Sequence, residues 1–530
     1  MTDNKSLPRA EYAERVGVSS KGVQELIDAL LAKNVDVHSM MIIRHGAVAC
    51  EAWREPLTAD MPHMVYSVTK SFFATAFGFA VEEGLITKQT RFLDIFPEYT
   101  PKKPDEKLEK LTLFNLISMT SGKRPSTSGR KGPDWLDEFV QSDWEFSPGD
   151  EWRYSSANYY AAACALVKLT GMSVTQYLTP RLFEPLGIDV PFWETSPDGI
   201  EAGGWGLTLK TEDVAKLILC YHNKGMFNGV QVIPESWAVE AVKKQNDNSA
   251  VQKKSDCKAG YGYGFWRCAG LPNTFRCEGV YSQYAISMAD YDACLVITSS
   301  HADLQQTLDI IWEHIPGVFM HDDEQPRGIT VKIAPPPAPP VTPHSTLESK
   351  LNGRRYKMYR KLFLNIIGLP VSALPMPIIF FSKESCGNVD DVSFSFNGDI
   401  LTMQWQESHG KYKNSIHAAM DGTYAHGAVE FGELKLDTES YAFWRDESTL
   451  EVYIRPTASV ATRRFVFRFK GSFISMYPDA IPGIDEKAKT MGETLKTILV
   501  GRYFHTWIDI LVPLVKYILQ PKHFGRVKKK

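Results

Sequence analysis

The sequence predicts a protein in two parts, a mixed α/β part followed by a part built mostly of β-strands. Apolar residues recur at helical spacing over residues 21–33, which predicts a helix. Two apolar runs around the turn His45-Gly46-Ala47 predict a β-hairpin over residues 38–53. Beyond residue 390, alternating apolar and polar residues separated by turn signals predict an antiparallel meander that forms a small barrel or sandwich.

The boundary between the two parts is the proline-rich segment 335–343, PPPAPPVTP. Proline fixes φ and removes a backbone donor, so this segment favours an extended linker. A chain of 530 residues also exceeds one ordinary domain of about 100–200 residues. We therefore predict an α/β domain over residues 1–330, a linker over 331–344, a β-rich, barrel-like domain over 345–485 and a helical, basic tail over 486–530.

The composition excludes several classes of protein. A net charge of −3 leaves no excess of Lys and Arg large enough to cover a nucleic acid, so no nucleic-acid partner is expected. Eight cysteines without a CxxC pair predict neither a disulfide framework nor a metal site. The N-terminal segment lacks the apolar core of a secretory signal, which favours a cytoplasmic location. The oligomeric state stays open.

The last segment of the chain combines a helical pattern with a basic end. Residues 495–519 mix apolar side chains with a few charged ones, and the chain ends in GRVKKK. A helix packed against the protein is the favoured interpretation. A weak contact between this basic tail and an anionic membrane surface is the alternative, because an apolar helix face beside lysines suits such a surface.

A serine and a lysine three positions apart point to a nucleophile. Ser67-Val68-Thr69-Lys70 precedes a long apolar helical pattern, which places Lys70 one turn beyond Ser67 on the same face. A serine hydroxyl needs a neighbour that takes its proton, and a lysine buried among phenylalanines loses its charge more easily. Alone the motif is weak, because a helix-capping serine with a surface lysine gives the same pattern.

Two later segments supply further candidates. Tyr154 stands between a Pro-Gly turn and a helical pattern, where a neighbouring ammonium would lower its pKa and let it shuttle a proton. Residues 277–284, CEGVYSQY, precede a very apolar strand pattern. Gly279 would let a substrate approach the backbone, and the N–H groups of Val280 and Ser67 would form an oxyanion hole.

Together these motifs resemble the serine β-lactamase-like superfamily, in the branch of class C β-lactamases, esterases and 6-aminohexanoate-dimer hydrolases. The motifs follow in the order SVTK (67–70), LFNLISMTSG (113–122), PG-x4-YSS (148–156), GGWGLTLKTEDVAKLI (203–218), GVQVIPESW (229–237), GYGYGFW (260–266) and GVYSQY (279–284). The resemblance implies an α+β fold with an antiparallel sheet flanked by helices and a helical subdomain. It also implies that Ser67 is acylated, that Lys70 is its base, that Tyr154 helps protonate the leaving group, and that no cofactor is needed.

The sequence departs from this family at the second and third motifs. Ser156 stands where the branch often has asparagine, with Asn158 nearby, and Cys277 stands where a lysine or histidine usually begins the third motif. The cation that would hold a substrate carboxylate is therefore missing, which argues against efficient binding of penicillins. The residues predicted to contact substrate are Ser156, Cys277, Glu278, Gly279 and Gln283.

The sequence thus predicts a serine hydrolase that cleaves a small-molecule ester or amide through a Ser67 acyl-enzyme. Two alternatives stay open. An acyltransferase would form the same acyl-enzyme and pass the acyl group to an alcohol or amine instead of water. A non-catalytic binding protein would keep the fold without the chemistry, although an intact set of Ser67, Lys70 and Tyr154 argues against it.

Overall fold

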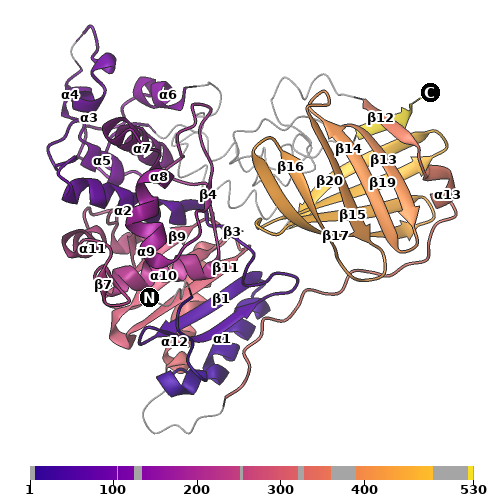
Figure 1. Cartoon of the computed structure of the whole chain (residues 1–530), viewed down its shortest axis with the longest axis horizontal. Helices are drawn as coiled ribbons and strands as arrows, with labels where there is room; N and C mark the ends of the chain where they lie inside the picture. Colours follow the sequence, from indigo (N-terminus) through magenta and orange to yellow (C-terminus); the bar gives the residue numbers. More distant parts are fainter. Residues whose placement is uncertain are drawn as a thin grey trace. The chain divides into compact units, whose positions relative to one another are not determined.

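The structure is a computed structural model that describes residues 6–103, 105–124, 134–250, 255–319, 328–359, 389–481 and 523–528. The chain divides into two units (Figure 1). The first comprises residues 1–54 and 58–333, and the second comprises residues 55–57 and 334–530. Residues 328–345, which include the predicted linker, contain no helix or strand. Within the second unit, Thr342 accepts a hydrogen bond from the backbone N–H of Trp444 at 3.1 Å.

The first unit is built on a six-stranded antiparallel sheet with the strand order β2-β1-β11-β10-β9-β8. Its strands are β1 (Val37–Arg44), β2 (Ala47–Trp53), β8 (Trp266–Arg267), β9 (Thr274–Gly279), β10 (Gln283–Met288) and β11 (Ala293–Ser299). The predicted hairpin is confirmed as β1 and β2. The apolar pattern that follows residue 284 forms two strands instead of one, because the 3-10 turn Ala289–Tyr291 and the left-handed Asp292 reverse the chain.

Helices surround this sheet and build a second, mostly helical region. They are α1 (Ser20–Ala32), α2 (Thr69–Glu82), α3 (Phe92–Ile95), α4 (Glu106–Lys110), α5 (Leu113–Ile117), α6 (Trp135–Gln141), α7 (Ser156–Thr170), α8 (Val174–Leu178), α9 (Glu184–Leu186), α10 (Thr211–His222), α11 (Glu235–Ala241) and α12 (Leu304–Val318). Short strands lie among them: β3 (His63–Met64), β4 (Phe192–Trp193), β5 (Leu207–Leu209), β6 (Met226–Phe227) and β7 (Val230–Gln231). The helix predicted over residues 21–33 is confirmed as α1. Within the described ranges, no helix combines the length and the hydropathy needed to cross a bilayer.

The two faces of the six-stranded sheet belong to two separate cores. Ile42 and Leu295 lie in the core that α1 and α12 cover. Their chain neighbours Met41 and Val296 lie in the other core, on the side of α10. Successive residues of a strand point to opposite faces, so each apolar strand supplies both cores. This explains why these strands are apolar throughout and do not alternate.

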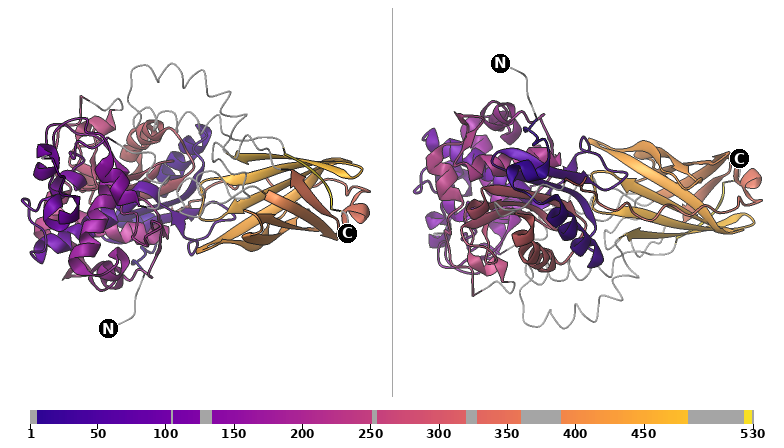
Figure 2. Two further views of the ribbon diagram at one scale, coloured as in Figure 1. Left: turned by 90° about the horizontal axis from the view of Figure 1, so that it is seen from above. Right: turned by 90° about the horizontal axis from the view of Figure 1, so that it is seen from below.

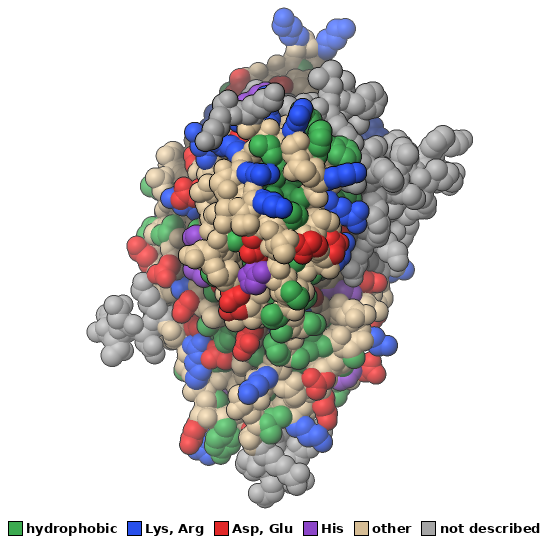
Figure 3. Space-filling model, turned by 90° about the vertical axis from the view of Figure 1, so that its right-hand side faces the viewer, with side chains coloured by type: hydrophobic (Ala, Val, Ile, Leu, Met, Phe, Trp, Pro, Cys, Tyr) green, Lys and Arg blue, Asp and Glu red, His purple; other side chains and the backbone are tan. Residues whose placement is uncertain are grey.

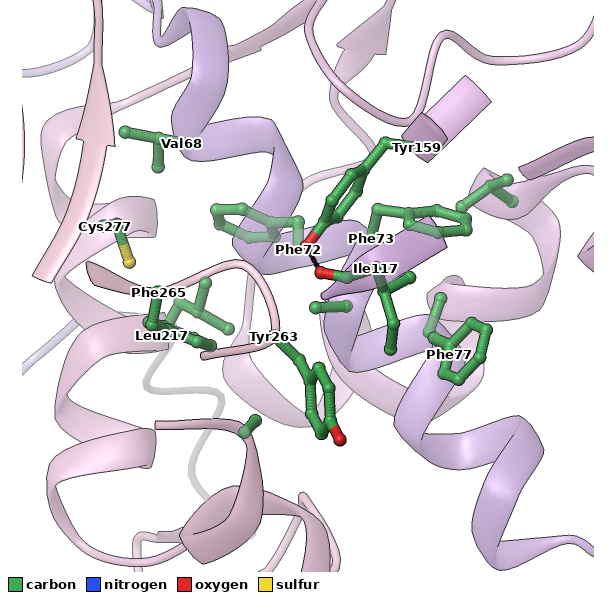
Figure 4. Close-up of a cluster of buried hydrophobic side chains, with 14 of the residues drawn as sticks. Val68, Phe72, Phe73, Phe77, Ile117, Tyr159, Leu217, Tyr263, Phe265 and Cys277 are labelled. Atoms are coloured by element: carbon green, nitrogen blue, oxygen red, sulfur yellow. Dashed lines mark hydrogen bonds between the residues drawn. The ribbon is translucent and has the colours of Figure 1, made fainter. Parts of the chain in front are cut away.

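Helix α2 lies at the centre of the helical core. Its residues Phe72, Phe73 and Phe77 are fully buried (Figure 4). Tyr159 of α7 packs against Phe73 with ring centroids 5.8 Å apart, and its hydroxyl donates to the Ile117 carbonyl at 2.9 Å. Each buried phenylalanine contributes roughly 1.5–3 kcal/mol to folding. The packing therefore fixes the position of the residues at the start of α2.

The second unit is a closed β-barrel whose neighbouring strands run antiparallel except at the pair that closes the ring (Figures 1 and 2). Its elements are α13 (Glu348–Leu351), β12 (Arg355–Tyr359), β13 (Val389–Asn397), β14 (Ile400–Glu407), β15 (Tyr412–Ala419), β16 (Ala425–Phe431), β17 (Leu434–Asp446), β18 (Thr449–Pro456), β19 (Thr462–Lys470), β20 (Phe473–Ile481) and β21 (His523–Val527). Nine strands close into a ring because β15 pairs with β17 at Ala419 and Tyr441, and β16 pairs with β17 beside them. The predicted barrel or sandwich is confirmed as a barrel.

The prediction of a helical tail is wrong for the last described residues. His523–Val527 form strand β21, which pairs with β12 and β20. The backbone groups of those two strands need partners, and this segment supplies them. Such pairing depends on strands far away in the sequence, so the local pattern did not reveal it. The rest of the predicted tail, residues 486–522, lies outside the described residues.

Candidate active site

Ser67 lies in a 3-10 turn, Tyr66–Val68, directly before α2. Tyr66 has a φ of 49°, a left-handed conformation that residues other than glycine rarely adopt. Its ring packs edge to face on Tyr281 with centroids 5.4 Å apart, and this packing holds the strained turn in place. The turn places the Ser67 side chain at the N-terminal end of α2, where the helix dipole favours negative charge.

Lys70 reaches three acceptors from the first turn of α2. Its Nζ lies 3.1 Å from Ser67 Oγ, 2.9 Å from Ser156 Oγ and 2.6 Å from the Gly204 carbonyl oxygen. Only 1% of the Lys70 side chain is exposed. The Nζ also lies 4.8 Å from the centre of the Tyr154 ring. The structure therefore brings residues from three segments of the sequence, Ser67, Tyr154 with Ser156, and Gly204, around the amino group of Lys70.

Burial lowers the pKa of Lys70 well below its usual value, as the sequence predicts. A neutral amine has two N–H groups and one lone pair. Because Ser156 Oγ and the Gly204 carbonyl accept the two N–H groups, the lone pair is left facing Ser67 Oγ. In this protonation state Lys70 can accept the proton of the Ser67 hydroxyl.

Tyr154 lies two residues before α7, at the predicted junction of loop and helix. Its ring stacks on Trp266 with centroids 5.7 Å apart and contacts the edge of Tyr261. Burial raises the pKa of Tyr154 well above its usual value, an effect that Tyr261 strengthens and a hydrogen bond with Ser67 opposes. The predicted lowering of this pKa is therefore wrong, because burial of the Tyr154 ring disfavours the charged phenolate. A neutral phenol in this position can donate a proton.

The sequence left open whether Ser156 or Asn158 contacts Lys70. In the structure Ser156 makes this contact. Asn158 is completely buried, and its Oδ1 accepts a hydrogen bond from Ser121 at 2.9 Å. Its amide therefore holds a neighbouring loop. Ser156, predicted to contact substrate, contacts the amino group of Lys70 instead, so its role here is to orient that group.

The third motif lies at the end of β9, which packs against the turn that carries Ser67. A Cβ at Gly279 would lie 2.4 Å from the Val65 carbonyl oxygen. Only glycine, which has no Cβ, lets β9 come this close to the turn that carries Ser67. Val280 is the next residue, and the role of its N–H in an oxyanion hole stays a prediction.

Gly279→Ala is expected to push β9 away from the turn that carries Ser67. The added Cβ would overlap the backbone oxygen of Val65, which cannot move aside as a flexible side chain can. We therefore expect a loss of about 1–3 kcal/mol in the free energy of unfolding and a drop in kcat/KM of at least about tenfold. Thermal melts and ester hydrolysis would measure both. Gly317→Ala is the matched control, because a Cβ there meets no atom within 4 Å. A Gly279→Ala protein with wild-type melting and activity would contradict the close-approach argument.

Cys277 and Glu278 occupy very different surroundings. The Cys277 thiol is fully buried, and burial raises its pKa to about 12, so it carries no charge. Glu278 pairs with Arg276 at 2.7 Å, and the Arg276 guanidinium is itself fully buried and donates to the Arg267 carbonyl at 2.8 Å. Glu278, on the same strand, thus neutralises the charge of Arg276.

Gln283 is buried and its amide is used inside the protein. Its Nε2 donates to the carbonyl oxygens of Tyr281 at 2.9 Å and Ser299 at 2.7 Å. These bonds hold the turn between β9 and β10, where Tyr281 and Ser282 both have positive φ. The substrate contact predicted for Gln283 stays untested, and its visible role is to brace this turn.

Sequence reasoning missed two contributors to the site. The Gly204 carbonyl could not be found from the sequence, because every residue has a carbonyl oxygen and only the fold shows which one contacts Lys70. Arg276 could have been found, because residues i and i+2 of a strand share a face and Arg276 is two before Glu278. In the described part of the chain, no group of three or more His, Cys, Asp or Glu side chains is arranged to hold a metal ion.

Comparison with known proteins shows the family to which the chain belongs. A family model described as Beta-lactamase matches residues 23–315. A protein of Escherichia coli (strain K12) named Beta-lactamase is 25% identical over 212 residues, which cover 34% of this chain and 55% of that protein. The chain thus spans about half the length of this relative.

Two solved structures can be set beside it. The octameric penicillin-binding protein homologue from Pyrococcus abyssi has a TM-score of 0.46 at 14% identity, covering 86% of this chain and 97% of its own. A family VIII carboxylesterase has a TM-score of 0.46 at 16% identity, covering 56% and 97%. The chain belongs to the beta-lactamase family, whose model matches more than half of it.

Proposed function

We propose that this protein is a serine hydrolase that cleaves an ester or amide bond of a small molecule through an acyl-enzyme on Ser67. The observation that carries the proposal is the set of contacts of Lys70. Its buried amino group has two acceptors besides Ser67 and therefore directs its lone pair at the Ser67 hydroxyl. A surface lysine beside a capping serine would have neither the burial nor these partners.

In the proposed mechanism Lys70 takes the proton from Ser67 as Oγ forms a bond with the substrate carbonyl carbon. The N–H groups of Ser67 and Val280 stabilise the oxyanion. Tyr154 donates its proton to the leaving group as the bond to the carbonyl carbon breaks, and Lys70 returns the proton it took to Tyr154. Water then attacks the acyl carbon and gives one proton to the same pair. The bond between the acyl carbon and Ser67 Oγ breaks, Oγ takes up that proton, and the acid is released.

The preferred substrates in this proposal carry no carboxylate next to the scissile bond. Cys277 is neutral, and Arg276 is already bound to Glu278. A substrate carboxylate would find no free cation on β9 and would lie near the Glu278 carboxylate. Aromatic side chains such as Tyr154 and Trp266 instead suit apolar acyl groups.

Labelling with a fluorophosphonate tests the proposal. We expect one adduct per chain, located on Ser67 by peptide mass spectrometry and absent from Ser67→Ala. Labelling elsewhere, or none with any reactive acyl or phosphonate probe, would favour a non-catalytic binding protein. Product analysis with an added alcohol or amine would then separate a hydrolase, which releases the free acid, from an acyltransferase, which gives the transferred ester or amide.

A further inference from the structure

The outer surface of four neighbouring barrel strands, β19, β20, β21 and β12, carries cations without carboxylate partners. The exposed cations are Lys357, Arg468, Lys470, Arg526 and Lys528. Within the described residues, none of the five takes part in an ion pair. In the upper half of the face that Figure 3 shows, Lys and Arg side chains gather around hydrophobic ones.

Three aromatic side chains lie among these cations. Phe473 is 53% exposed, Tyr359 51% and Phe524 48%. In the strand register, Phe524 lies opposite Tyr359, and Phe473 lies opposite Arg526, whose guanidinium is 5.3 Å from the centre of the Phe473 ring. We call these eight side chains the basic aromatic face. Exposed aromatic side chains that cluster on one face are typical of an interaction surface.

The carboxylates closest in the register do not neutralise this face. Asp391 lies opposite Lys357, but its carboxylate pairs with Arg355 at 2.7 Å. Asp479 of β20 pairs with Arg464 at 3.3 Å. The whole chain carries a net charge of −3, so the basic aromatic face is a local concentration of positive charge and calls for an anionic partner.

We propose that the basic aromatic face docks onto an anionic lipid surface. Lysines and arginines are attracted to anionic headgroups, while aromatic rings prefer the boundary between headgroups and acyl chains. The sequence that follows β12 favours a lipid surface over a nucleic acid as the partner, because residues 362–382 include no charged residue. The membrane contact that the sequence suggested for a basic helix is thereby assigned to a strand face, to which the basic end contributes Arg526 and Lys528.

Vesicle co-sedimentation of the full chain tests this assignment. We expect binding to vesicles of phosphatidylcholine with phosphatidylserine, no binding to phosphatidylcholine alone, and loss of binding at high salt. Lys357→Gln/Lys470→Gln/Arg526→Gln should weaken binding by about 100-fold, since each cation contributes about fivefold. Phe473→Ser, which removes one ring and no charge, should weaken it several-fold.

The matched control is Lys413→Gln/Lys435→Gln, which removes exposed cations from β15 and β17 and should leave vesicle binding unchanged. Circular dichroism and thermal melts of each variant show that the barrel is folded. Absence of vesicle binding at low salt, or equal weakening by the control, would overturn the proposal. So would vesicle binding that survives the triple substitution, because another part of the chain would then bind lipid. Binding to heparin or single-stranded RNA without binding to vesicles would identify a polyanion site and overturn it as well.

Discussion

Ser67→Ala abolishes hydrolysis of p-nitrophenyl butyrate in the mechanism proposed for this protein. Loss of the nucleophile in a serine hydrolase lowers kcat by about 10⁴-fold or more. No neighbouring group can replace it, because Lys70 and Tyr154 only move protons and every bond to the acyl group forms at Oγ. Initial rates of wild type and variant, purified side by side, measure the effect, with a panel of esters and amides if the first substrate is slow.

Ser236→Ala is the matched control for this experiment. Ser236 is an exposed serine on α11 and touches none of the proposed catalytic residues. It should keep wild-type activity and melting temperature. Equal activity of wild type and Ser67→Ala would show that Ser67 is not the nucleophile, and the mechanism would be wrong.

Lys70→Met has the second large expected effect. It removes the only described amine in contact with Ser67 Oγ, so kcat/KM should fall by about 10³-fold or more. In the wild type, kcat/KM should rise with pH as Lys70 loses its proton, and this rise should occur well below the pKa of an ordinary lysine because burial lowers the pKa of Lys70. A pH profile of kcat/KM for both proteins measures the effect.

The same substitution should not destabilise the protein and should raise its melting temperature near neutral pH. Because the pKa of Lys70 is lower in the folded than in the unfolded state, the unfolded chain binds more protons between the two values. Lys70 therefore reduces stability below its folded pKa, and that loss disappears as pH rises toward the unfolded value. Methionine removes the buried charge and keeps the volume.

Lys123→Met separates a catalytic lysine from a merely buried one. Lys123 is also buried with its pKa lowered to about 8, but its Nζ donates to the carbonyl oxygens of Val140 and Ser142. This variant should keep the rise of kcat/KM with pH. If Lys70→Met retained the same rise, or if Lys123→Met lost it, Lys70 would not be the titrating base.

The helices and strands near the site were predictable because each depends on a short stretch of sequence. The two apolar runs around the turn His45-Gly46-Ala47, which form β1 and β2, and the apolar helical pattern of α2 are each contained in a short continuous segment. The turn and helix around Tyr154 followed from the same local signals. The strand β21 was missed because its residues acquire their conformation from β12 and β20, which are remote in the sequence.

The sequence by itself determined the family and the order of the motifs, and it singled out Ser67, Lys70 and Tyr154 as candidates that the structure places together. Only the tertiary structure decided that Ser156 and Gly204, and not Asn158, orient Lys70, and that Arg276 neutralises Glu278. It also reversed the expected direction of the pKa shift of Tyr154. The physical reason is that protonation depends on burial and on partners from several segments at once, and neither quantity is encoded in any single stretch of chain.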